Sequence, residues 1–441
     1  MKEEYKNMTN QELYQSKLCG VDECIAQIRD GDIVTVGADC NEPEAILTRL
    51  HLAADRLHNV TLVKGRTGSY ECIHKPGMAG HIDSRNFFFS ADLREGFRQG
   101  NTSFVPADLP DFGPFSNGFL PTNVYIVSTT PMDEDGNFGV GLSLMYDKET
   151  LETCLAQPNG RVILEVNPNL HPVRGELKIN IKDVACLTEA PRALPAVPYA
   201  PSTEVEDKIG AYVAELVNDG DTIQLGIGSL PDAVARALMS KKELGLHTEM
   251  FTSSMGEMIR KGIITGERKN LNPGLHVGTF AGGDQALYDT LSQNPNCRIA
   301  PGSYAVNPMI IMQNDNMVSI NTILEMDLTG QVCSESIGTT QFSGSGGGFC
   351  FAYGALHSKG GRGILTFASR SKKGQPKIKT VLTPGAAVTI PRNYVDYIVT
   401  EYGVAALRGR SVRERAKALI AIAHPDDRAE LTRQARELLY I

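Results

Sequence analysis

Short apolar runs rich in β-branched residues recur along the chain and alternate with segments of helical periodicity. In the first half these runs are residues 33–37, 60–63, 86–90, 124–128 and 162–166. In the second half they are residues 222–225, 277–279, 317–320, 363–368, 387–390 and 397–400. Strands that alternate with helices favour parallel sheets with helices packed against them. The pattern therefore predicts an α/β protein whose sheets are mostly parallel.

Proline divides the chain into two halves. The segment APRALPAVPYAP at residues 190–201 holds four prolines, which keep a chain extended and stop helices. A chain of 441 residues is long enough for two domains with separate cores. We therefore predict an N-terminal domain at residues 1–190, a Pro-rich linker at 191–202 and a C-terminal domain at 203–441. Two amphipathic helices are expected at residues 411–423 and 425–439.

Composition narrows the class of protein. The chain is 41% hydrophobic and 21% charged, which is typical of a globular protein. Its net charge of −8, without a long basic run, argues against nucleic acid as a partner. No stretch approaches the roughly 20 apolar residues that span a bilayer, and the polar first 17 residues do not resemble a secretory leader. We therefore expect a cytoplasmic protein that does not associate with membranes.

The nine cysteines are scattered along the chain. None of them forms a C-x-x-C motif or a Cys/His pattern with the spacing of metal ligands. The sequence therefore predicts neither a disulfide framework nor a metal site.

A glycine turn follows the β-like run at residues 222–225. It reads Gly226-Ile227-Gly228 and leads into a helix that Pro231 is expected to open. Free amides and the positive end of the helix dipole favour an anion at such a turn. Gln224 adds a side-chain amide that can donate to an oxyanion. The alternative is a turn that needs glycine for its geometry alone.

A single carboxylate, Glu249, follows this helix in the motif His-Thr-Glu-Met. Its flanking residues are apolar or aromatic, which favours partial burial. Such a carboxylate can attack an activated acyl group while nearby amides hold the oxyanion. The alternative is an ordinary surface glutamate, and His247 is interpreted as a hydrogen-bonded structural histidine.

A second glycine-rich segment, SGSGGGF at residues 343–349, lets backbone approach a ligand closely. The segment SKGG follows at residues 358–361, where Lys359 either meets a phosphate or faces water. The alternative for the glycine-rich segment is a flexible loop. Residues 317–330 predict a strand followed by an acidic turn.

Taken together, these segments resemble the acetyl-CoA hydrolase/transferase family, and within it the 4-hydroxybutyrate and butyrate–acetate CoA-transferases. The resemblance runs through nearly the whole chain and depends on the order and spacing of nine segments. These are residues 131–136, 165–168, 224–228, 246–251, 313–317, 325–330, 343–347, 358–361 and 399–404.

The resemblance implies two α/β CoA-transferase domains with mostly parallel sheets and an active site at their interface. It implies that Glu249 is the catalytic nucleophile, and we place Gln224 beside it as an oxyanion donor. CoA-binding backbone is expected at Gly226, Ile227, Gly228, Ser229, Leu230, Ile323 and Gly346, to which we add Gly344, Gly347 and Lys359. CoA enters as a substrate, with no metal and no permanently bound cofactor, and the family suggests a homodimer or homotetramer.

The implied reaction moves CoA from a short-chain acyl-CoA, such as butyryl-CoA or 4-hydroxybutyryl-CoA, to a carboxylate such as acetate. Two alternatives are a hydrolase that uses the same site and a non-catalytic CoA-binding protein. A nicotinamide-dependent enzyme is disfavoured because Pro231 stands where the third glycine of G-x-G-x-x-G belongs.

The sequence also departs from the family pattern. Relatives commonly carry Gln, Asp and Arg where this chain has Gly348, Cys350 and Tyr353. These changes remove charge and favour a short aliphatic acyl group. Asn41 stands where glycine is frequent in relatives.

Overall fold

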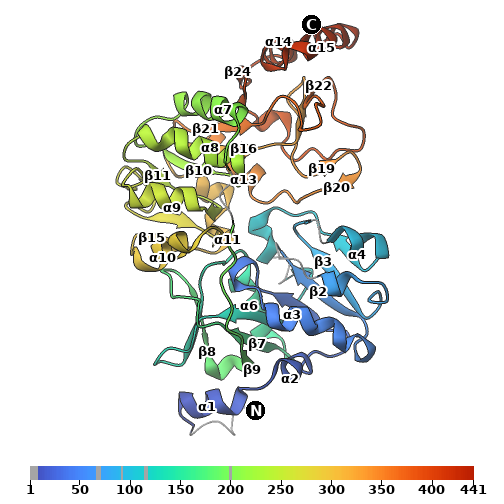
Figure 1. The fold of residues 1–441 in the computed structure, drawn as a ribbon, viewed down its shortest axis with the longest axis vertical. Coiled ribbons are helices and arrows are strands. Elements are labelled where there is room, and N and C mark those ends of the chain that lie inside the picture. The colour runs from blue at the N-terminus through green and yellow to red at the C-terminus, as the bar shows by residue number, and fades with distance from the viewer. Residues whose placement is uncertain (1–7, 66–70, 91–92, 114–117, 198–200) are drawn as a thin grey trace. The chain divides into compact units, whose positions relative to one another are not determined.

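The computed structural model describes residues 8–65, 71–90, 93–113, 118–197 and 201–441 (Figure 1). The chain forms two compact units. Unit 1 comprises Met1–Ala196 and Thr279–Ser303, and unit 2 comprises Val197–Gly278 and Tyr304–Ile441. Of the predicted linker, residues 198–200 lie outside the described residues. The preceding part packs within unit 1, where the Tyr288 hydroxyl donates to the Pro195 carbonyl at 2.6 Å.

Unit 1 is built on a seven-stranded sheet with the strand order β4-β3-β2-β1-β5-β7-β9, in which every neighbouring pair is parallel. The strands are β1 (Ile33–Val36), β2 (Val60–Lys64), β3 (Ile82–Asn86), β4 (Thr102–Phe104), β5 (Val124–Thr129), β7 (Arg161–Val166) and β9 (Val184–Glu189). Its helices include α1 (Asn10–Lys17), α2 (Val21–Ile25), α3 (Glu44–Leu50), α4 (Leu93–Gln99), α6 (Asp147–Ala156) and α10 (Gln285–Gln293). An antiparallel pair joins β6 (Asn137–Val140) to β8 (Leu177–Asn180).

The predicted strands of unit 1 are confirmed with one exception. The apolar run at residues 86–90 predicts a strand, but β3 is Ile82–Asn86 and ends where that run begins. The strand itself is partly polar, because its side chains alternate between more and less buried positions. Phe87 and Phe89 are buried beyond its end, and their apolar character reflects this packing.

Unit 2 contains a six-stranded sheet with the order β11-β10-β16-β21-β23-β24, parallel except for the final hairpin between β23 and β24. The strands are β10 (Thr222–Leu225), β11 (Gly245–Leu246), β16 (Met317–Thr322), β21 (Arg362–Thr366), β23 (Tyr397–Thr400) and β24 (Gly403–Ala406). Short strands outside this sheet include β12 (Met250–Phe251), β13 (His276–Gly278), β17 (Glu325–Asp327), β18 (Val332–Cys333) and β22 (Ile378–Lys379). Helices of this unit include α7 (Glu204–Glu215), α8 (Ser229–Ala237), α9 (Ser253–Arg260), α12 (Pro308–Ile311), α13 (Gly348–His357), α14 (Val412–Ile422) and α15 (Pro425–Glu437).

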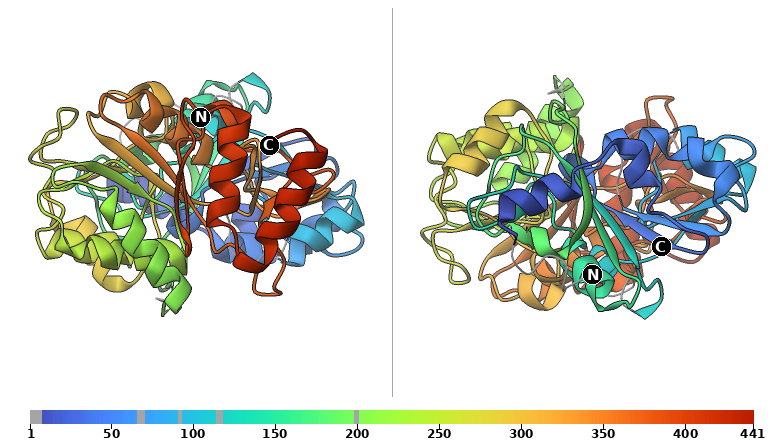
Figure 2. Two further views of the ribbon diagram at one scale, coloured as in Figure 1. Left: turned by 90° about the horizontal axis from the view of Figure 1, so that it is seen from above. Right: turned by 90° about the horizontal axis from the view of Figure 1, so that it is seen from below.

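The two C-terminal helices are confirmed as α14 and α15, which lie side by side (Figure 2). Ser411 caps α14 by accepting the Glu414 amide, and Pro425 begins α15 at the helical position that proline prefers. The strand predicted at residues 387–390 is wrong. That segment is irregular, and it pairs with another strand only through an isolated bridge from Ile390 to Val332 in the described structure. The side chains of Ser336 and Thr389 hold it by further hydrogen bonds.

Each unit has its own hydrophobic core. Unit 1 packs α2 and α3 against strands β1, β2 and β5, through residues such as Ile46, Val34 and Ile126. Unit 2 packs α14 against β23 and the small sheet around β17, through Leu419, Ile398 and Met326 among others. Among the described residues, no helix combines the length and the apolar character needed to cross a bilayer.

Candidate active site

The strand order of unit 2 reverses between β10 and β16. The chain passes from β10 to β11 on one side of the sheet and then returns to place β16 on the other side of β10. In open α/β sheets, ligands bind beyond the carboxyl ends of the strands at such a reversal. The glycine turn directly follows the carboxyl end of β10, so the sheet topology points to the same place as the sequence motif.

Two carboxamides meet across this reversal. The Gln224 Nε2 donates to Asn321 Oδ1 at 3.0 Å, and Asn321 Nδ2 donates back to Gln224 Oε1 at 3.1 Å. Gln224 is buried, so the pair fixes the orientation of its amide. One N–H of Gln224 is therefore already engaged, and Asn321 is a functional candidate that the sequence analysis missed.

The glycine turn offers two of its three amides to a ligand. Gly226 N–H donates to the Ile320 carbonyl at 2.9 Å, so the predicted oxyanion role of this amide is not supported. In the part of the chain that the structure describes, no partner is seen for the amides of Ile227 and Gly228, and both residues are exposed. Gly228 has a φ of 112°, a conformation that favours glycine.

Helix α8 begins at Ser229, so the prediction that Pro231 opens it is wrong by two residues. Pro231 still lies in the first turn, where a missing N–H breaks no helical hydrogen bond. The Ser229 hydroxyl donates to Glu206 Oε1 at 2.5 Å, and Leu230 is buried. Ser229 and Leu230 therefore shape the start of the helix, while the exposed backbone of residues 227–228 faces outward.

Glu249 lies beyond the carboxyl end of β11, the strand that pairs with β10. Strand β11 runs parallel to β10 with Leu246 level with Ile223, and the His247 amide donates to the Ile223 carbonyl at 3.2 Å. The Glu249 side chain is half-buried. Its Oε2 accepts the Gly347 amide at 3.0 Å.

The glycine-rich segment forms the other wall against this carboxylate. Gly347 is the residue that caps the N-terminus of α13, so Glu249 sits at the positive end of that helix dipole. A β-carbon on Gly347 would overlap Glu249 Oε2, and one on Gly346 would lie 3.4 Å from Oε1. Gly346 also has a φ of 54°. These glycines are therefore required for close approach of backbone to the carboxylate. Gly344 lies earlier in the loop, where its carbonyl accepts the Ser343 hydroxyl.

Buried groups hold the segment that carries Glu249. The His247 imidazole is fully buried with Nε2 2.8 Å from the Ala305 carbonyl, which agrees with its predicted structural role. The Lys269 Nζ donates to the carbonyls of Leu246 and Leu275 at 2.9 and 2.7 Å. Burial lowers the pKa of Lys269 to about 7. The Thr248 amide donates to the Val277 carbonyl at 2.8 Å, so the backbone on the N-terminal side of Glu249 is fixed.

This arrangement makes stability depend on pH through His247. Burial, reinforced by the Lys269 ammonium, lowers the pKa of His247 to about 3 from its ordinary 6.5. Below about pH 6.5 the His247 imidazole therefore binds a proton in the unfolded chain but stays neutral in the folded chain. The free energy of unfolding falls as the pH drops. We expect His247→Gln to flatten this slope by up to about 1.4 kcal/mol per pH unit between about pH 6 and 4. Denaturant unfolding across that range checks it, and equal slopes in both proteins would contradict it.

The carboxamide pair yields a second prediction. Asn321→Ala leaves the buried Gln224 amide without its partner, which is expected to cost about 1–3 kcal/mol of stability. Because Gln224→Ala removes the same two hydrogen bonds, the double variant is expected to lose less than the sum of the single losses, by about 1 kcal/mol. Urea unfolding of the four proteins measures this coupling. Strictly additive losses would show that the pair does not act as one unit.

Two sequence-predicted residues lie apart from this group. Ile323 follows the carboxyl end of β16 and is buried, but its amide donates to the Thr366 carbonyl at 3.2 Å. Lys359 lies after the C-terminal end of α13, where its carbonyl accepts the Asn316 amide at the start of β16. This is the opposite edge of the sheet, and the Lys359 Nζ lies 3.6 Å from Asp315. The structure therefore does not bring Lys359 to the candidate site.

The three unusual positions of α13 differ in surroundings. A β-carbon on Gly348 would meet nothing within 4 Å, so this position borders open space. Cys350 is buried. The Tyr353 ring stacks on His357 with centroids 4.1 Å apart and lies 5.1 Å from the Tyr394 ring. Tyr353 thus belongs to an aromatic cluster on α13, and Gly348 alone adjoins the glycine loop.

Comparison with known proteins identifies the family. Residues 1–198 match the acetyl-CoA hydrolase/transferase N-terminal domain, and residues 283–435 match the C-terminal domain. The succinyl-CoA:cyclohexane-1-carboxylate CoA transferase of Geobacter metallireducens is 38% identical over 428 residues, covering 96% of each chain. The 4-hydroxybutyrate coenzyme A transferase of Clostridium kluyveri is 37% identical over 437 residues, covering 97% of this chain and 99% of its own.

A solved structure agrees with these matches. The crystal structure of RipA from Yersinia pestis superposes with a TM-score of 0.92 at 32% identity, covering 98% of this chain and 100% of RipA. Relatives named acetyl-CoA hydrolases are more distant, at 23% identity. The two full-length relatives named above are CoA-transferases, and the chain belongs to the acetyl-CoA hydrolase/transferase family.

Proposed function

We propose that this protein is a CoA-transferase that moves CoA from a short-chain acyl-CoA to a carboxylate such as acetate. The observation that carries the proposal is the position of Glu249. Its carboxylate accepts the Gly347 amide at the N-terminus of α13, at the carboxyl edge of the sheet that also bears the glycine turn. The names of the full-length relatives support the same reaction class.

In the first half of the proposed reaction, a Glu249 oxygen attacks the carbonyl carbon of the acyl thioester. The C–S bond breaks, which leaves an acyl–glutamyl anhydride and CoA thiolate. The thiolate then attacks the glutamyl carbonyl of the anhydride. This step releases the first carboxylate and leaves a glutamyl–CoA thioester, so the thioester energy is kept on the protein.

In the second half, the incoming carboxylate attacks the glutamyl thioester and expels CoA thiolate, which forms a new anhydride. The thiolate attacks the acyl carbonyl of that anhydride, so the new acyl-CoA leaves and Glu249 regains its carboxylate. Each addition places negative charge on a carbonyl oxygen. The Gln224 amide and the exposed amides of Ile227 and Gly228 are the proposed donors to that oxygen.

The proposed CoA site consists of two stretches of backbone. It comprises the turn from Gly226 to Leu230 and the loop through Gly346 and Gly347, where glycine allows a ligand to approach. The acyl group is proposed to be short and aliphatic, such as butyryl or 4-hydroxybutyryl. The absence of a side chain at Gly348, the one of the three unusual positions that adjoins the glycine loop, supports this choice.

Hydrolysis by the same site is the second candidate function. Water would then replace the incoming carboxylate, and free CoA would be released instead of exchanged. The greater distance of the hydrolase relatives favours transfer. A non-catalytic CoA-binding protein would retain the glycine turn but would have no use for a carboxylate held at the N-terminus of α13.

A panel of acyl-CoAs tests the proposal. Acetyl-CoA, butyryl-CoA and 4-hydroxybutyryl-CoA are incubated with the full-length protein, with and without a second carboxylate, and thioesters are separated by chromatography. We expect a new acyl-CoA to form only when the second carboxylate is present, and free CoA to remain a minor product. Release of free CoA at an equal rate without the second carboxylate would establish the hydrolase instead.

A further inference from the structure

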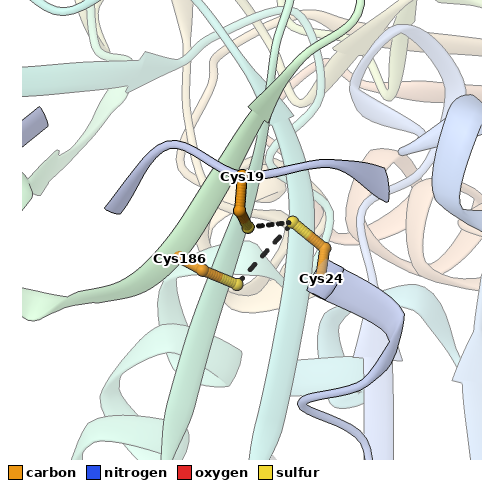
Figure 3. A group of neighbouring side chains, drawn as sticks. All are labelled: Cys19, Cys24 and Cys186. Carbon is orange, nitrogen blue, oxygen red and sulfur yellow. Dashed lines mark hydrogen bonds between the residues drawn. The ribbon is translucent and has the colours of Figure 1, made fainter. Parts of the chain in front are cut away.

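Three cysteine side chains far apart in the sequence meet at the edge of the sheet in unit 1 (Figure 3). Cys19 lies between α1 and α2, Cys24 lies on α2, and Cys186 lies on β9. The Cys24 Sγ is 3.5 Å from the Cys19 Sγ and 3.7 Å from the Cys186 Sγ. All three sulfur atoms lie within 4.8 Å of one another.

These spacings suit a single thiophilic metal ion. Zinc–sulfur bonds are about 2.3 Å long, so thiolate sulfurs around a tetrahedral zinc are about 3.8 Å apart. Thiols that only pack as small apolar groups can have similar distances in pairs. Here three sulfurs converge on one point, which a metal site requires and simple packing does not.

The surroundings also fit such a site. Cys24 and Cys186 are part of the buried core of unit 1, and Cys19 packs against it while remaining partly exposed. A buried pair of sulfurs favours a soft ion over the oxygen-seeking Mg²⁺ and Ca²⁺. Cys19 is partly exposed, so a metal ion could reach the three sulfurs from its side.

We propose that Cys19, Cys24 and Cys186 form a zinc site that ties the N-terminal segment to the edge of the sheet. Strand β9 is an edge strand, and the segment between α1 and α2 reaches it through the Cys19 amide, which donates to the Leu187 carbonyl at 2.9 Å. On binding, each thiol gives its proton to solvent and its sulfur to the ion. The ion would then join α2 and the segment between α1 and α2 to strand β9.

Zinc(II) binding to the reduced full-length protein tests this proposal. The protein is loaded with zinc(II) under anaerobic conditions, desalted and analysed for metal. We expect about one zinc per chain, and cobalt(II) in its place should give a sulfur-to-metal charge-transfer band. We also expect zinc(II) to raise the melting temperature, because an ion that binds only the folded chain stabilises it.

Matched serine variants locate the site. Cys24→Ser removes the central sulfur, and Cys19→Ser removes the partly exposed one, so the second variant remains informative if the first fails to fold. Both are expected to lose zinc(II) affinity by more than about 100-fold, together with the charge-transfer band and the gain in melting temperature. Cys154→Ser is the control, because Cys154 is also buried in unit 1 but its Sγ contacts the Arg161 carbonyl instead of another sulfur.

Two outcomes would overturn the proposal. One is a wild-type protein that retains no zinc(II) after desalting. The other is a folded Cys19→Ser variant, judged by circular dichroism, that binds zinc(II) as tightly as wild type.

Discussion

Replacing Glu249 with glutamine is expected to lower the turnover of acyl transfer by about 10³-fold or more, because the amide is not nucleophilic. The change is nearly isosteric. The glutamine carbonyl oxygen can still accept the Gly347 amide, so the contact between residue 249 and the N-terminus of α13 is preserved. Stability should therefore change little, and any loss of activity reports on chemistry. Steady-state kinetics and thermal unfolding of the two proteins measure both quantities.

Glu257→Gln is the matched control for this experiment. Glu257 lies on α9 in the same unit, its side chain is 41% exposed, and its carboxylate pairs only with Lys261 of the same helix at 2.6 Å in the described structure. A surface ion pair of this kind contributes little. We expect Glu257→Gln to keep wild-type turnover. Near-wild-type turnover in Glu249→Gln would instead rule out Glu249 as the nucleophile.

Gly347→Ala is expected to lower kcat/KM by about 10²-fold, because misplacing a reacting group by about 1 Å has an effect of that size. The backbone at Gly347 has a φ of −95° and a ψ of 5°, which alanine can adopt. The added β-carbon would, however, overlap Glu249 Oε2 and the Val306 side chain. The carboxylate must then move away from the Gly347 amide that holds it.

Gly348→Ala is the control for Gly347→Ala, one residue further along the chain. Its β-carbon would meet nothing within 4 Å, and the residue is the first of α13. We therefore expect activity close to wild type and, from the better helix propensity of alanine, up to about 1 kcal/mol of added stability. Equal loss of activity in both variants would show that the loop needs flexibility instead of space for the carboxylate.

Most strands of the two large sheets could be predicted, because strands buried on both faces are continuous apolar runs. Strands β5 and β7 are buried at every position, and both were recognised from the sequence. Strand β3 was misplaced because its own residues, Ile82–Asn86, are partly polar while the apolar residues pack after it. An apolar run indicates that its residues are buried, but buried residues need not form a strand.

Only those parts of the candidate site that lie in local sequence motifs could be predicted. Short strands and turns carry Gln224, the glycine turn and Glu249. Each of these can be recognised from its own stretch of sequence. The partner of Gln224 could not be found in this way, because Asn321 lies 97 residues away and meets it only through the pairing of β10 with β16. The same pairing uses the Gly226 amide, which the sequence suggested as a donor to the oxyanion.

The cysteine cluster was missed for a related reason. Cys24 and Cys186 are 162 residues apart, and no ligand spacing in the sequence links them. They meet because α2 packs against β9. A rule based on spacing detects metal sites within one loop or hairpin, whereas this group is assembled by the order of the strands in the sheet.

Mass spectrometry of the protein during turnover tests the central claim most directly. Full-length protein is mixed with butyryl-CoA without a second carboxylate, quenched in acid and digested, and the peptide that contains Glu249 is analysed. The account predicts that this peptide carries CoA as a thioester on Glu249, and that adding acetate removes it. A peptide that stays unmodified while butyryl-CoA is consumed, or CoA attached to a different residue, would contradict it.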